Sequence, residues 1–271
     1  MSGQAEKAER FLARHRPGDP LLLPNAWDAG SAKLLAAVGF EALATTSSGH
    51  AATLGQLDGT VTREQALAHA EQIVRATDLP VSADLENCYA DDPDGVAETV
   101  RGALATGLAG CSIEDFTGEL DDPIYPRELA HERVASAVAA AHGGEVQFVI
   151  TARCENYLRG RTDIEDTLSR LLAYQEAGAD VLYAPGVRSS EDIGRLTSAL
   201  ERPLNVLTVP GAPAVAELSA LGVARISVGG AFAFNALGAL VEAAQELRER
   251  GTYGFLERSA GGIRAARDAF G

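Results

Sequence analysis

The chain has 271 residues, 46% of them hydrophobic, and a formal net charge of −15 at pH 7. This length suits one domain with one large core, and the negative charge argues against nucleic acid or an anionic membrane as a partner. There is no run of about 18 apolar residues, and residues 1–20 lack the apolar segment of a signal peptide. We therefore expect a cytoplasmic protein whose three cysteines are reduced, buried thiols.

Apolar strand-like segments alternate with alanine-rich amphipathic segments along the whole chain. We predict strands at residues 21–27, 42–48, 80–86, 110–115, 147–154, 180–185, 204–209 and 225–229. We predict helices at residues 29–38, 62–76, 93–106, 127–142, 163–177, 189–200, 214–221 and 231–250, and an additional helix at 254–270. Helix starts are indicated by three capping patterns: Thr62 with Gln65, Thr162 with Glu165, and Ser190 before two acids.

Strand–helix units repeated in this way, with no linker between them, predict an α/β fold: a single (β/α)8 TIM-type barrel over residues 1–271. Its N-terminal arm covers about 1–20 and its C-terminal helical extension about 231–271. A doubly wound open sheet is the weaker alternative, because no G-x-G-x-x-G opens the first helix.

Acidic residues gather where the predicted strands end, which is where barrel enzymes place their chemistry. Asp84 and Glu86 are two residues apart and are expected on one side of their strand, whereas only one of Glu114 and Asp115 can face the site. We favour Glu114, with Asp115 as a structural partner. Converging carboxylates are costly unless a cation neutralises them, so they indicate a hard-metal site. The alternative for Asp84 and Glu86 is a capping or barrel-layer pair, and for Asp58 a surface loop acid.

Other polar groups share the same predicted edge. Arg153 suits bidentate binding of a substrate carboxylate, although it could instead pair with a neighbouring acid. The small-residue segment 45–50 offers hydroxyl and backbone N–H groups to an oxyanion. Residues 225–232 read equally as a phosphate site or as close strand–helix packing, so we assign them no role. The only lysines, Lys7 and Lys33, are not at strand ends, which argues against Schiff-base chemistry.

The motifs S-S-G, L-G-Q-L-D-G, P-V-S-A-D-L-E, I-E-D and T-A-R-C-E occur in this order between Ser47 and Glu155. Together they resemble the isocitrate lyase/phosphoenolpyruvate mutase superfamily, and the resemblance runs from about Leu22 to Asn235. The resemblance implies a Mg²⁺-dependent barrel, with Mn²⁺ as a substitute, that acts on small 2-oxo or 2-hydroxy acids through an enolate. It also implies a homodimer or homotetramer in which the eighth helix packs on a neighbouring barrel.

The resemblance further implies roles for individual residues. Asp84 would bind the metal most directly, and the shell would be completed, largely through water, by Asp58, Glu86 and Glu114. The 2-oxo-carboxylate would be held by Ser47 and the backbone of Ser48 and Gly49, with Arg153 opposite and Asn205 contacting the distal part of the substrate. The residues predicted to be catalytic are Arg153, Ser47 and Asp58. The proton donor is unassigned among Tyr89, Cys88, His50 and a metal-bound water.

The segment 116–126 departs from the family pattern. It lacks the K-[KR]-C-G-H motif of the isocitrate and methylisocitrate lyases and the lysine- and asparagine-bearing loop of the phosphonopyruvate mutases. The expected reaction is C–C bond cleavage or decarboxylation of a small 2-oxo or 2-hydroxy (di)carboxylic acid. The alternatives are a phosphonopyruvate mutase or hydrolase, and a non-catalytic 2-oxo-acid binding protein.

Overall fold

The computed structural model describes residues 3–271, and all nine of its strands are parallel members of one sheet. β1 (Leu21–Leu23) pairs with β9 (Arg225–Ser227), and β2 (Asn25–Ala26) pairs with β3 (Leu43–Thr45). The two ends of the sheet therefore belong to the same stretch of chain, and the sheet closes into a barrel. The predicted first strand is divided because Pro24 has no N–H to donate. This is the predicted TIM-type barrel.

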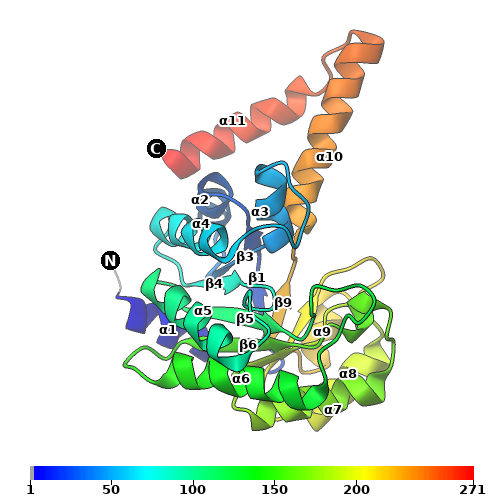
Figure 1. Cartoon of the computed structure of the whole chain (residues 1–271). Helices are drawn as coiled ribbons and strands as arrows, with labels where there is room; N and C mark the ends of the chain where they lie inside the picture. Colours follow the sequence, from blue (N-terminus) through cyan, green and yellow to red (C-terminus); the bar gives the residue numbers. More distant parts are fainter. Residues whose placement is uncertain (1–2) are drawn as a thin grey trace.

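The remaining strands follow in chain order around the barrel: β4 (Val81–Asp84), β5 (Gly110–Glu114), β6 (Val149–Arg153), β7 (Val181–Tyr183) and β8 (Leu204–Leu207). The helices between them surround the strands (Figure 1): α2 (Ala29–Val38), α4 (Arg63–Ala76), α5 (Pro93–Ala105), α6 (Arg127–His142), α7 (Ile164–Glu176), α8 (Ser190–Ala199) and α9 (Val215–Ala220). Each connection returns the chain to the same end of the barrel, so the carboxyl ends of all strands face one mouth.

Two α-helices and one short 3-10 helix (Asn156–Arg159) among residues 3–271 were not predicted. The arm at 1–20 contains α1 (Gln4–Ala13), whose Phe11 is fully buried against residues at the beginnings of strands, among them Leu21 and Val149. α1 therefore lies against the amino ends of the strands. The predicted strand 42–48 ends early, at Thr45, and the rest of the small-residue segment 45–50 caps and begins α3 (Ser47–Thr53).

Helix caps agree only in part with the predicted patterns. Thr62 and Gln65 form a reciprocal capping box at the start of α4, as predicted. The other two predicted caps are wrong by one residue. Asp163 caps α7 because its carboxylate accepts from two backbone N–H groups, and Ser189 caps α8 through the backbone N–H of Asp192.

The C-terminal extension leaves the barrel. α10 (Ala231–Gln245) continues through a π-helical turn (Glu246–Arg250), and α11 (Leu256–Phe270) turns back toward α2 (Figure 1). Only Ala233 of α10 is buried, while Leu240 is 64% exposed and Val241 is 53% exposed. This chain by itself thus leaves the apolar side of α10 uncovered.

Within residues 3–271, no helix combines the length and the apolar character that crossing a membrane requires. Cys88, Cys111 and Cys154 are free and buried, as predicted.

Candidate active site

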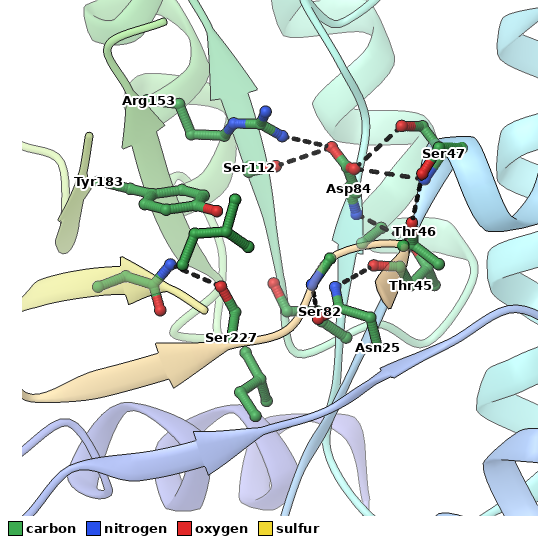
Figure 2. A pocket seen from close by; sticks show the side chains of 18 of the residues that line it. Asn25, Thr45, Thr46, Ser47, Ser82, Asp84, Ser112, Arg153, Tyr183 and Ser227 are labelled. Atoms are coloured by element: carbon green, nitrogen blue, oxygen red, sulfur yellow. Dashed lines mark hydrogen bonds and ion pairs between the residues drawn. The ribbon is translucent and has the colours of Figure 1, made fainter. Parts of the chain in front are cut away.

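A pocket of about 170 Å³ opens at the mouth of the barrel and extends down between the strands. Figure 2 shows Asp84 and Arg153 pointing toward each other from β4 and β6, with Ser47 on the other side of Asp84. The predicted site residues that line the pocket are Ser47, Ser48, Asp58, Asp84, Arg153 and Asn205.

Asp84 is the centre of the hydrogen-bond network at the mouth. Its Oδ2 accepts from the backbone N–H of Ser47 at 3.3 Å and from the Ser47 hydroxyl at 3.1 Å. Its Oδ1 lies 2.8 Å from Arg153 and accepts from the Ser112 hydroxyl at 3.4 Å. Donors from α3, β5 and β6 therefore fix the carboxylate in one orientation.

Arg153 is held by three carboxylates. Its guanidinium lies 2.8 Å from Asp84, 2.8 Å from Glu114 and 3.0 Å from Glu155. Burial raises the pKa of both Glu114 and Glu155, and the adjacent arginine charge acts in the opposite direction. The pairing with acids, given above as the alternative for Arg153, is thus present here, and it aims the arginine into the pocket.

Glu86 reaches the site by a route that the sequence argument did not foresee. The expectation that strand alternation aligns Asp84 and Glu86 is wrong, because β4 ends at Asp84. The next residues form a turn in which Glu86 (φ 50°), Cys88 (φ 61°) and Tyr89 (φ 55°) adopt the left-handed conformation. Such backbone is uncommon for residues other than glycine and often marks a functional site.

A buried arginine holds this turn in place. Arg133, on α6, is 1% exposed and donates to the carbonyls of Asn87 at 2.5 Å, Ala90 at 2.9 Å and Glu114 at 3.2 Å. Its guanidinium also lies 4.0 Å from the ring centroid of Tyr125. Backbone carbonyls and an aromatic face thus compensate the charge of this arginine, and the turn is fixed from behind.

The carboxylates at the mouth crowd one another. Burial, followed by the charges of Asp84 and Asp58, raises the pKa of Glu86 to about 7. The pKa of Asp58 is raised by burial and then by Asp84. Such crowding indicates excess negative charge that a bound cation would relieve.

The donor set fits Mg²⁺ or Mn²⁺, because the groups around Asp84 offer oxygen ligands. Among residues 3–271, no three Asp, Glu, His or Cys side chains converge closely enough to enclose an ion by themselves. The arrangement therefore suits an ion that takes only some of its ligands from the protein, as Mg²⁺ commonly does.

Several predicted residues lie outside the pocket lining. Glu86 lies in the turn beside Asp84, and Glu114 lies behind Arg153. The N–H of Gly49 donates to the Thr46 side chain at 3.3 Å, so it already has a partner. The structure separates Asp115 from the site, as predicted: it pairs with Arg170 and with the Tyr174 hydroxyl. The roles of the predicted site residues in binding and catalysis remain predictions.

Two of the four possible proton donors are also away from the pocket. His50 stacks on His69 with ring centroids 3.8 Å apart. Cys88 is fully buried, and burial raises the pKa of its thiol to about 12. The Tyr89 hydroxyl donates to Glu86 at 3.3 Å and so remains near the acidic group.

A polar layer inside the barrel was only partly visible in the sequence. The pocket is also lined by Asn25, by Thr45 and Thr46 of the segment 45–50, and by Arg225 and Ser227 of the segment 225–232. Ser82, Ser112 and Tyr183 line it as well and were assigned no role from the sequence. A signal was available, since Ser82 precedes Asp84 by two residues on a strand and shares its side. Asn25 also ties the barrel seam, because its Oδ1 accepts from the N–H groups of Val228 and Gly229 and its Nδ2 donates to the Thr45 carbonyl.

Comparison with known proteins identifies the family. The family model for phosphoenolpyruvate phosphomutase matches residues 11–248. The chain belongs to this family. The predicted isocitrate lyase/phosphoenolpyruvate mutase resemblance is thereby confirmed.

Individual relatives span most of the chain. An uncharacterized protein of Mycobacterium tuberculosis is 37% identical over 222 residues, which are 81% of each protein. The crystal structure of a candidate lyase/mutase from Burkholderia cenocepacia J2315 is 52% identical, with a TM-score of 0.91 over 94% of this chain and 92% of that one. The structure of a 2,3-dimethylmalate lyase is 29% identical, with a TM-score of 0.83 over 94% of this chain and 90% of that one.

Proposed function

We propose that the protein is a Mg²⁺-dependent lyase acting on a small 2-oxo or 2-hydroxy carboxylic acid. The reaction would be cleavage of a C–C bond, including loss of CO₂, with negative charge developing as an enolate. The observation that carries the proposal is the Asp84 carboxylate, oriented by Ser47 and Arg153 at the mouth of a small barrel pocket. Membership of the family and similarity to a 2,3-dimethylmalate lyase support the reaction class.

The residues that would hold the ion are Asp84 directly and Asp58, Glu86 and Glu114 around it. A bound Mg²⁺ would act as a Lewis acid that stabilises the developing enolate charge. Ser47 and Ser48 bind and orient the substrate carboxylate from one side, and the guanidinium of Arg153 does so from the other. Tyr183 also lines the pocket, and burial raises its phenol pKa to about 12, so at neutral pH the hydroxyl keeps its proton and can donate.

The size and charge of the site favour small acids. A pocket of about 170 Å³ leaves little room for a bulky substituent. The segment 116–126 beside the mouth carries Glu119, Asp121 and Asp122 and no basic residue, which disfavours a phosphonate dianion or a tricarboxylate. A short mono- or dicarboxylic acid fits both constraints.

The proposal includes the setting of the enzyme. The buried, free thiols suit the reducing cytoplasm, and the exposed apolar side of α10 suits a homodimer or homotetramer.

The test is a turnover screen of 2-oxo and 2-hydroxy acids with Mg²⁺ or with EDTA, using wild type, Asp84→Asn and Asp94→Asn. Asp94 is an exposed acid in the first turn of α5 and serves as the matched control. We expect Mg²⁺-dependent turnover in wild type and Asp94→Asn, and a loss of about a thousandfold or more in Asp84→Asn. Binding of Mn²⁺, followed by electron paramagnetic resonance, should weaken in Asp84→Asn alone. Turnover and metal dependence that survive in Asp84→Asn would refute the assignment.

A further inference from the structure

A second buried arginine lies deeper in the same pocket. Arg225, on β9, is 4% exposed and lines the cavity that also contains Asp84 and Arg153. It donates to the Thr151 hydroxyl at 3.0 Å and contacts Nε2 of His15 at 3.3 Å. Its Nε–H is buried without a partner. Its only hydrogen-bond partners in the described chain are therefore a hydroxyl and an imidazole.

The imidazole carries no compensating charge. Nδ1 of His15 lies 2.9 Å from the Phe11 carbonyl, which fixes the proton on Nδ1 and leaves Nε2 as an acceptor for Arg225. Burial, followed by the charge of Arg225, lowers the pKa of His15 to about 3, so the ring is neutral at physiological pH.

The charge of Arg225 itself is uncompensated. No carboxylate oxygen within residues 3–271 lies within 4.0 Å of its guanidinium. Burial lowers its pKa only to about 10, so the group remains protonated at neutral pH. An unpaired buried cation is costly, and the contrast with Arg153, which is paired with three carboxylates in the same pocket, indicates a missing anion.

The position of Arg225 defines where that anion would lie. Its partner Thr151 precedes Arg153 by two residues on β6, which is a distance of about 6.6 Å along a strand. Asn205 and Ser227, hydrogen-bonded to each other at 2.9 Å, line the wall of the same cavity. The pocket thus has a cationic floor one layer below its mouth.

We propose that Arg225 is a specificity residue that receives the second carboxylate of a dicarboxylic substrate. The first carboxylate and its 2-oxo or 2-hydroxy group would face Asp84 and Arg153, so the inference rests on the function proposed above. A guanidinium fork suits a carboxylate, and a buried charged pair discriminates strongly against a ligand that leaves one member unpaired.

The experiment compares lactate with malate, which is lactate carrying a second carboxylate on its methyl carbon. Affinities are measured by calorimetry with Mg²⁺ for wild type, Arg225→Met and Arg225→Lys. We expect wild type to prefer malate by about tenfold to a hundredfold, Arg225→Met to lose this preference, and Arg225→Lys to keep part of it. Lactate affinity should change little. Arg225→Lys retains the charge, so it keeps the test open if Arg225→Met folds poorly.

The outcomes separate the two proposals. Equal wild-type affinity for both acids, or an unchanged malate preference in a folded Arg225→Met protein, overturns the role of Arg225 and leaves the proposed function intact. If neither acid binds to wild type, whether or not Mg²⁺ is present, the proposed function itself is overturned. Phosphate serves as the probe for a resident free anion. If phosphate raises the melting temperature of wild type but not of Arg225→Met, and wild type binds malate no better than lactate, the role of Arg225 in substrate binding is wrong.

Discussion

Replacing Arg133 with methionine tests whether the turn after β4 depends on a single buried side chain. The substitution keeps much of the apolar volume but removes the donors to the carbonyls of Asn87, Ala90 and Glu114. A hydrogen bond to a charged group contributes roughly 1.5–3 kcal/mol, and removal of the buried charge itself offsets part of the loss. We expect the free energy of unfolding to fall by about 3–5 kcal/mol, a large part of the 5–15 kcal/mol typical of a domain.

Urea denaturation followed by far-ultraviolet circular dichroism measures this change. Arg101→Met on α5 is the matched control, because Arg101 is exposed and its loss should cost less than about 0.5 kcal/mol. Arg133→Lys should be intermediate, since an ammonium group reaches fewer carbonyls than a guanidinium fork. If Arg133→Met unfolds within about 1 kcal/mol of wild type, the left-handed turn is held by something other than these contacts.

Two further predictions concern the surface. Hydrogen bonding to Asp180 raises the pKa of His142, so the pair stabilises the fold below pH 6.5 and the contribution is lost as pH rises through the folded-state pKa. Because the His142 side chain is 39% exposed, the free energy of unfolding of His142→Gln should lie within about 0.5 kcal/mol of the wild-type value at pH 6 and closer still at pH 9, measured by urea titration. A difference that grows as the pH rises would contradict the pairing. Light scattering should give wild type a mass at least twice the 28.3 kDa of one chain. Leu240→Glu, on the exposed side of α10, should lower that mass without unfolding the barrel. A wild-type monomer would contradict an interface at α10.

The local sequence was enough to predict most of the barrel. Parallel strands buried on both faces read as continuous apolar runs, and the capping box at Thr62 and the glycines that end helices mark the boundaries. A polar residue that follows such an apolar run stands out in the sequence as a strand end, so Asp84 and Arg153 could be singled out. α1 was missed because its sequence is largely polar and only a few side chains, such as Phe11, pack against the barrel.

What the tertiary structure alone decided is how the polar groups meet. The alternation of side chains along a strand predicts which residues share a side, but it does not apply once the backbone leaves the strand, as it does before Glu86. The partners of Arg133 and Arg153 are far apart in the sequence, and the pairing of β4, β5 and β6 side by side in the sheet brings them within hydrogen-bond distance. Arg225 begins the segment 225–232, which the sequence left open between a phosphate site and close strand–helix packing. Its unpaired charge became visible only when the surrounding strands were in place, because charge compensation is a property of neighbours in space.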